Sequence, residues 1–135
     1  MPNTLQLAEA ILEMSKRTWI ETSKQTADLT ESEFLVLDYL VECGTATVGE
    51  AGKHVKLLPA QMSRVLRRLE TAGMVSCDIN ADDRRRVDIT TTGQGRRSHA
   101  NYQNAKRAPI IAALDRLTEK ERSQFMALVQ KMARH

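Results

Sequence analysis

The chain has 135 residues, with 20 basic and 17 acidic side chains, and its hydrophobic content of 41% includes only 4% aromatic residues. This length suits one domain with extensions, and its core must be built mainly from aliphatic side chains. No apolar run is long enough to span a membrane and no signal-peptide layout opens the chain, so the cytoplasm is the expected location. Two cysteines, Cys43 and Cys77, make neither a disulfide framework nor a metal site.

The charges are distributed unevenly along the chain. Residues 1–52 carry 3 basic and 9 acidic side chains, residues 53–97 carry 10 and 5, and residues 98–135 carry 7 and 3. A basic region attracts polyanions at long range. Net charge alone, however, does not distinguish DNA from RNA or from an acidic protein.

Helical periodicity predicts a first helix over residues 4–25, whose apolar face is so wide that it must be buried against something. Thr30 and Glu33 match the S/T-x-x-E capping box, which predicts the start of a second helix that ends at Cys43. A short β-prone segment over 45–48 follows, and then a short helix over 49–55.

Residues 57–73 form the next predicted helix, which has Pro59 in its first turn and ends at Gly73. Its apolar stripe has the i, i+3, i+4, i+7 spacing of one helix face and consists of Met62, Val65, Leu66 and Leu69. The opposite face is small, polar and basic, with Ala60, Ser63, Arg64, Arg67 and Thr71 at its centre and Gln61 and Arg68 at its flanks. Such a face fits the DNA major groove when a second helix precedes it across a short turn; the alternative is a solvated face.

A β-hairpin is predicted directly after this helix. Residues 74–79 alternate apolar and polar side chains, residues 80–83 are turn-forming, and residues 84–90 return as the second strand. Three arginines lie at or beside the tip of the hairpin: Arg84, Arg85 and Arg86. A cationic hairpin beside a recognition helix is typical of the wing of a winged helix, which contacts the DNA backbone and the minor groove. The alternative is a solvated charge run, partly paired with Asp82 and Asp83.

The C-terminal part is predicted to be helical. A helix over 93–113 contains Pro109, which is expected to kink it or split it. Thr118 and Glu121 form a second capping box, which predicts a last helix with an apolar stripe.

No enzyme motif is present in the chain: it has no phosphate loop, no G-x-G-x-x-G, no G-x-S-x-G and no H-E-x-x-H. His54, His99 and His135 share no metal-ligand spacing with each other or with a cysteine pair. We therefore predict a protein that is not an enzyme and that needs no cofactor and no metal.

The ordered set of elements resembles the MarR family of bacterial transcription regulators. LTESEFLVLDYL, from residue 29, resembles the family helix L-T-x-x-(F/Q)-x-x-L-x-x-L, and TVGEAGKHVKLLPAQMSRVLRRLETAGMV resembles its helix-turn-helix core. DDRRRVDITTTG resembles the wing signature D-x-R-R-x-x-x-(L/I)-T-x-x-G. Two departures are visible: Leu58 stands where the family usually has a serine N-cap, and the wing is shorter than the family's.

The resemblance implies a mainly α fold with a small β-hairpin wing, in which a winged helix-turn-helix domain is flanked by dimerisation helices. It places the N-terminal dimerisation helix at 1–28, the DNA-binding domain at 29–93 and the C-terminal dimerisation helices at 94–135. It implies a homodimer that binds a palindromic operator in double-stranded DNA, as a repressor relieved by a small ligand. The alternatives are a winged-helix module that binds RNA or an acidic protein, and an architectural DNA binder with no ligand response.

Residue roles follow from these expectations. Base-edge contacts are assigned to Gln61, Ser63 and Arg64, and phosphate contacts to Arg67 and Arg68, with Lys53 and Lys56 as secondary phosphate contacts. Arg84, Arg85 and Arg86 are assigned to the wing contacts. By resemblance, a cleft for a small aromatic effector would be lined by Leu12, Trp19, Phe34 and Tyr39. The favoured interpretation of these four residues is ordinary core. Oxidant sensing through Cys43 or Cys77 is not favoured, because neither has an activating environment in the sequence.

Overall fold

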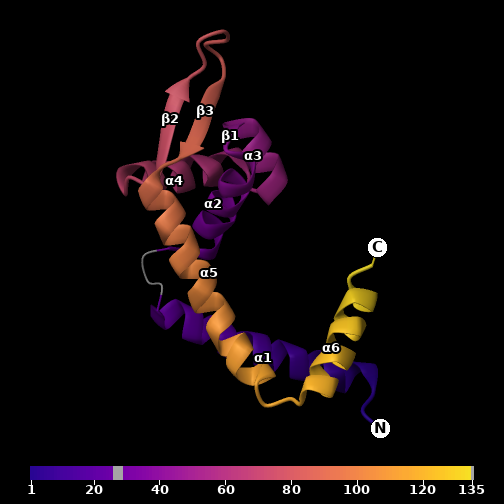
Figure 1. The fold of residues 1–135 in the computed structure, drawn as a ribbon. Helices are drawn as coiled ribbons and strands as arrows, with labels where there is room; N and C mark the ends of the chain where they lie inside the picture. The colour runs from indigo at the N-terminus through magenta and orange to yellow at the C-terminus, as the bar shows by residue number, and fades with distance from the viewer. Residues whose placement is uncertain (26–28, 135) are drawn as a thin grey trace. The chain divides into compact units, whose positions relative to one another are not determined.

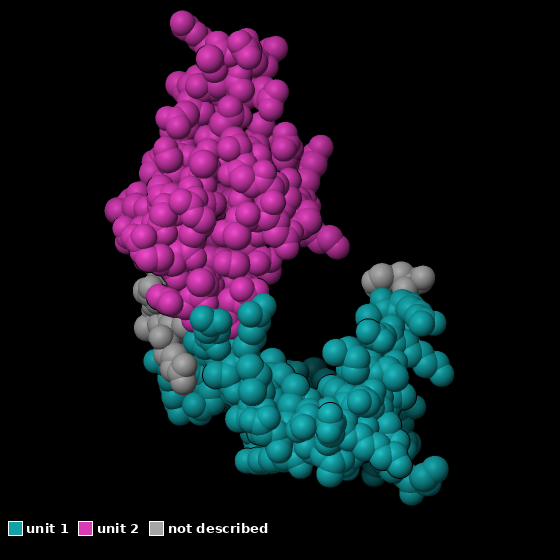
Figure 2. Space-filling model, in the orientation of Figure 1, with its two compact units in different colours: residues 1–25, 104–135 teal, residues 26–103 magenta. Residues whose placement is uncertain are grey.

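The computed structural model describes residues 1–25 and 29–134. The chain divides into two compact units (Figure 2): residues 1–25 with 104–135, here called the helical unit, and residues 26–103, here called the winged unit. In chain order the elements are α1 (Thr4–Gln25), α2 (Glu31–Cys43), β1 (Thr45–Thr47), α3 (Val48–Val55), α4 (Pro59–Thr71), β2 (Val75–Ile79), β3 (Val87–Thr91), α5 (Gly93–Leu114) and α6 (Glu119–Met132) (Figure 1). None of the described helices is both long enough and apolar enough to cross a bilayer.

A three-stranded antiparallel sheet closes one side of the winged unit, in the order β1-β3-β2. The predicted hairpin is present as β2 and β3, with Cys77 opposite Ile89. β1 adds a third strand along the other edge of β3, with Ala46 opposite the same Ile89. Because Ile89 lies in the central strand, it is fully buried and joins the sheet to the helical core.

The core of the winged unit is mainly aliphatic, as the composition predicted. The apolar stripe of α4 packs inward through Met62, Leu66 and Leu69, and meets Leu37 and Leu40 of α2. Burying this stripe orients α4, so that the opposite face of the helix is left at the surface.

Local capping sets two of the helix starts. The Thr30 hydroxyl accepts the N–H of Glu33 at 3.2 Å, and the Glu33 carboxylate accepts the N–H of Thr30 at 2.8 Å. Thr118 and Glu121 repeat this reciprocal arrangement at the start of α6. The bonds from Thr118 also lower the pKa of the Glu121 carboxyl. Both predicted capping boxes are therefore confirmed.

The structure differs from the prediction at the second hairpin strand and at Pro109. The second strand of the hairpin does not begin at Arg84 but at Val87, because Asn80 and Asp83 hold residues 81–86 in a turn. Pro109 was expected to kink the helix or split it, and the split is absent: α5 is one helix that contains Pro109 and runs on to Leu114. A proline removes one donor from the helix ladder, and the turns on either side can continue the helix when they keep their own bonds.

The first half of α5 belongs to the winged unit, which extends to Gln103 and thus beyond the boundary at 93 drawn from the sequence. Tyr102 donates to the Glu31 carboxylate at 2.8 Å, and the His99 ring lies 2.7 Å from the Asp38 carboxylate. The pKa of Tyr102 is raised to about 12. Burial of the phenol is the largest cause, and the hydrogen bond to Glu31 is the second. These two hydrogen bonds join the first half of α5 to α2.

Candidate nucleic-acid interface

Helix α4 presents a polar and basic face to solvent from Gln61 onward. Ser63, Arg64 and Arg67 are all exposed on the side opposite the buried stripe. Among the described residues, neither Arg64 nor Arg67 takes part in an ion pair. The arginines line a shallow hollow of about 360 Å³ together with Thr71 and Ala72. This face therefore carries positive charge that the fold itself does not use.

The start of α4 lacks the usual side-chain cap, because Leu58 occupies the N-cap position. The Gln61 side-chain oxygen compensates by accepting the N–H of Leu58 at 2.9 Å, which is one half of a capping box. Gln61 was predicted to contact a base edge, and the structure shows that its oxygen is also engaged within the helix. Its amide group still offers two donors toward the exterior.

Arg68 lies at the edge of the basic face and turns back into the fold. Its guanidinium forms a close ion pair with Glu33 of α2. The Glu33 side chain is only 2% exposed, whereas that of Arg68 is 52% exposed. Glu33 was missed as a partner for α4, because its place in the capping box already accounted for it in the sequence. The partner of Arg68 in the structure is thus a carboxylate of the same chain.

The wing, here residues 75–91, ends in a turn closed by its own polar side chains. The Asn80 oxygen accepts the N–H groups of Asp82 and Asp83 at 2.9 and 3.0 Å. The Asp83 carboxylate lies 3.3 Å from the Arg85 guanidinium, so one of the predicted partners of the arginine run is present. Such an exposed pair adds little stability, and it leaves Arg85 available to a stronger anion.

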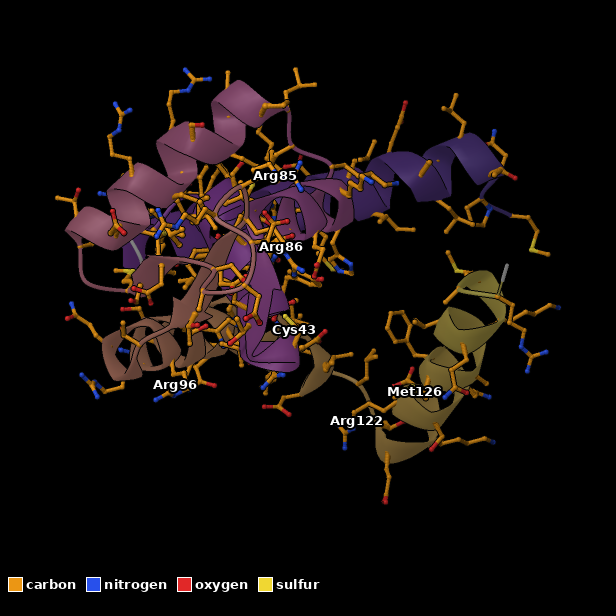
Figure 3. The ribbon with its side chains drawn as sticks, turned by 90° about the horizontal axis from the view of Figure 1, so that it is seen from above. Cys43, Arg85, Arg86, Arg96, Arg122 and Met126 are labelled. Atoms are coloured by element: carbon orange, nitrogen blue, oxygen red, sulfur yellow. The ribbon has the colours of Figure 1, made fainter. Side chains whose placement is uncertain are left out.

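The other two wing arginines differ in their surroundings. Arg86 reaches toward α3, where its guanidinium lies 3.9 Å from the Glu50 carboxylate. Arg85 and Arg86 are both visible beside the turn in Figure 3. Arg84 is exposed and, within the described residues, has no ion-pair partner. The wing therefore keeps at least one uncompensated cation at its tip.

Two further cations lie beside the start of α4. Lys53 and Lys56 are exposed at the end of α3, where Lys56 caps the helix in a left-handed conformation with φ of 57°. They line a pocket of about 490 Å³ whose walls include Leu58, Pro59 and Met62. The secondary phosphate contacts predicted from the sequence are thus brought next to the recognition helix.

The four residues predicted to line an effector cleft are divided between the units. Phe34 is buried in the winged unit, where its ring stacks on Tyr102 at 4.4 Å and on His99 at 5.1 Å. Tyr39 stacks on His54 at 4.3 Å. Leu12 and Trp19 are exposed on α1 in the helical unit. Phe34 thus has two aromatic neighbours in the winged unit, which fits the ordinary structural role considered as the alternative.

The two cysteines have different environments, which leads to a testable difference in reactivity. Cys43 is exposed (Figure 3), whereas burial and a hydrogen bond with Glu70 raise the pKa of Cys77 to about 11. The thiolate is the reactive form, so at pH 7.5 only about one Cys77 in 3,000 is reactive. We expect brief iodoacetamide treatment at this pH to alkylate Cys43 and to spare Cys77 until the protein is unfolded, as measured by peptide mass spectrometry. Equal labelling of both cysteines in the folded protein would contradict this environment for Cys77.

No group of three His, Cys, Asp or Glu side chains suited to a metal ion is found in the described ranges, and His135 lies outside them. The surface is instead organised around a helix-turn-helix, α3 and α4, with an arginine-tipped hairpin beside it. This combination defines the class of winged helix-turn-helix DNA-binding proteins.

Comparison with known proteins identifies the family. Residues 29–87 match the model of the MarR family. The HTH-type transcriptional repressor Rv2887 of Mycobacterium tuberculosis is 30% identical over 104 residues, which cover 77% of this chain and 75% of that protein. The chain belongs to the MarR family, and it is a DNA-binding transcriptional regulator rather than an enzyme.

Solved structures agree with this fold. The crystal structure of YusO from Bacillus subtilis superposes with a TM-score of 0.85 at 22% identity, covering 98% of each chain. A mutant of S. aureus MepR bound to an oligodeoxyribonucleotide has a TM-score of 0.73 at 23% identity, and the match covers 98% of this chain and 96% of that one.

Proposed function

We propose that this protein is a homodimeric repressor that recognises a palindromic operator in double-stranded DNA through α4 and the wing. The observation that carries the proposal is the exposed face of α4, where Arg64 and Arg67 have no ion-pair partner among the described residues. The MepR structure bound to an oligodeoxyribonucleotide and the repressor name of Rv2887 support it by similarity.

Each side chain has a distinct role in this proposal. Ser63 and Arg64 contact base edges, with Arg64 bidentate to a guanine, and Gln61 donates its amide hydrogens to an acceptor on a neighbouring base. Arg67 holds the helix on the phosphate backbone, as do Lys53 and Lys56 at its start. Arg68 keeps its bond to Glu33 and supports the position of α4 instead of contacting phosphate.

The wing contributes a second set of contacts. Arg84, which has no ion-pair partner in the described chain, enters the minor groove, and Arg85 and Arg86 contact phosphates. Phosphate is a stronger partner for Arg85 than the exposed Asp83 carboxylate, because DNA carries a dense array of charges.

Dimerisation is assigned to the helical unit, which exposes more apolar surface than a monomeric protein usually leaves in water. The large exposed side chains lie on α1, at the end of α5 and along α6: Leu5, Leu7, Ile11, Leu12, Met14, Trp19, Ile20, Ile110, Ile111, Phe125, Met126, Leu128, Val129 and Met132. A two-fold dimer would place its two α4 helices in successive major grooves, with half-sites about 10 bp apart.

The most specific part of the proposal is that a small aromatic effector relieves repression. An apolar hollow of about 210 Å³ in the helical unit is lined in part by Met14, Leu114 and Phe125. A cavity on the order of 150 Å³ is enough for one aromatic ring. Binding there would act on the helices assigned to dimerisation, and so on the spacing of the two α4 helices.

The test of the proposed function is selection of bound duplexes from a random pool, followed by fluorescence-anisotropy titration of the selected site. We expect an enriched palindrome, and we expect Arg64→Ala to weaken binding by about 30-fold or more, because the dimer loses one pair in each half-site, and to relax the sequence preference. The basis is a loss of about 1–3 kcal/mol for each bidentate arginine–guanine pair. Arg17→Ala removes an exposed arginine of α1 and serves as the matched control, with unchanged binding expected.

The outcome of the selection separates the alternatives. Salt-sensitive binding without an enriched sequence would favour an architectural DNA binder, and no binding to any duplex at low salt would favour an RNA- or protein-binding module.

A further inference from the structure

The first residues of the recognition helix form an unusual apolar surface. Leu58, Pro59 and Ala60 are consecutive in the chain, and all three are exposed. A run of three exposed apolar residues carries a cost in solubility, and in natural proteins it usually has a function. This run lies at the end of α4 that enters the groove in helix-turn-helix proteins.

Leu58 is the central feature of this surface. Its side chain is 69% exposed, the highest value among the large apolar side chains described in the winged unit. The adjacent Leu57, by contrast, is half-buried and packs against the core. The chain therefore uses one leucine of the pair for folding and turns the other outward.

Local stability does not explain the choice of leucine at this position. An N-cap favours serine, threonine, aspartate or asparagine, whose side-chain oxygen accepts a backbone N–H, and leucine offers no such acceptor. Gln61 partly compensates through its bond to the Leu58 N–H at 2.9 Å. The Leu58 carbonyl accepts the N–H of Met62 at 2.9 Å, so the backbone of Leu58 is bonded on both sides. The result is an apolar side chain that projects from a fixed position.

The surroundings of Leu58 match a DNA groove better than a protein partner. Lys53 and Lys56 line the same pocket as Leu58, and Arg64 lies one helical turn after Ala60 on the exposed face of α4. An apolar side chain that shares a pocket with two lysines is complementary to a surface that combines methyl groups with flanking phosphates. In the major groove, thymine presents such a methyl group, at C5.

We propose that Leu58 is a specificity-determining residue that selects thymine at one position of each half-site through contact with its 5-methyl group. This inference rests on the proposed function, because it requires α4 to occupy the major groove. It adds apolar readout of thymine to the hydrogen-bonding readout assigned to Ser63 and Arg64.

The test uses the intact protein and the duplex obtained by selection. Each thymine of the half-site is replaced in turn by deoxyuridine, symmetrically in both half-sites, which removes only the methyl group. At one position we expect the Kd of the wild-type protein to rise about 15-fold, since loss of one buried methyl contact accounts for about four-fold per half-site. The Leu58→Ser protein is expected to bind the thymine and uracil duplexes equally at that position.

Two controls keep the result interpretable. Leu58→Ser installs a favourable N-cap, so its melting temperature is expected to equal or exceed that of the wild type. Leu35→Ser removes another exposed leucine, on α2, and is expected to retain the full discrimination between thymine and uracil.

The outcomes distinguish this inference from the function on which it rests. An enriched palindrome with no uracil effect at any position, or with the same effect in Leu58→Ser, would overturn the role of Leu58 and leave the proposed function standing. If no duplex is enriched, the proposed function fails at the selection step, and the inference fails with it.

Discussion

Gly95→Ala is expected to destabilise the winged unit by about 3 kcal/mol or more, because a Cβ at this position has no room. It would lie 2.0 Å from the Met74 carbonyl oxygen and 2.8 Å from the Thr91 methyl carbon. The obstruction at Met74 is backbone, which cannot rotate away as a flexible side chain could. The same carbonyl accepts the N–H of Thr92 at 3.0 Å, so moving it would also disturb the junction between β3 and α5.

The measurement is urea unfolding followed by circular dichroism, at one protein concentration for all variants because dimerisation would contribute to stability. Gly49→Ala is the matched control, since a Cβ at Gly49 meets no atom within 4 Å. Gly49 lies in the first turn of α3, where alanine is expected to leave stability unchanged or to raise it by up to about 1 kcal/mol. Similar unfolding free energies for the two variants would show that α5 does not approach Met74 as closely as described.

Arg68→Met is expected to lower the free energy of unfolding by about 2 kcal/mol. The substitution leaves the buried Glu33 carboxylate without its cation, and removal of one partner from a buried pair typically costs about 3–5 kcal/mol. The lower value is expected here because Arg68 is half-exposed and its ion pair is partly screened by solvent. In the double variant Glu33→Gln/Arg68→Met, most of the loss should be recovered, since glutamine keeps an acceptor for the Thr30 N–H and removes the buried charge.

The salt dependence of DNA binding decides between the two roles considered for Arg68. Each phosphate contact contributes about 0.9 to the slope of log K against log salt concentration. We expect Arg67→Met to reduce this slope by about 2 for a dimer, and Arg68→Met to leave it unchanged while weakening binding through the position of α4. If Arg68→Met reduces the slope of log K against log salt concentration, Arg68 contacts phosphate, as the sequence predicted.

The sequence by itself determined the order of the elements and the starts of several of them. The helix starts at Thr30 and Thr118 were predictable because a capping box joins residues only three positions apart. The orientation of α4 was predictable for a similar reason, since its apolar stripe follows directly from the helical repeat. Gly73 follows the C-cap of α4 and has a φ of +76°, the left-handed conformation expected of a glycine at a helix end. The ordered motifs also indicated the family.

The tertiary structure alone decided which polar and aromatic side chains serve the fold and which remain at the surface. Arg68 bonds to a residue 35 positions away, and His99 and Tyr102 bond to α2 across 61 and 71 positions. Phe34 stacks on two side chains of α5, those of His99 and Tyr102. These partners are determined by how the elements pack, and the spacing of residues along the chain does not reveal them. A charged or aromatic side chain occurs in the same local sequence whether it contacts the protein core or DNA. Leu58 stands out as a surface residue only once the packing has shown that Leu57 is the leucine of the pair that contacts the core.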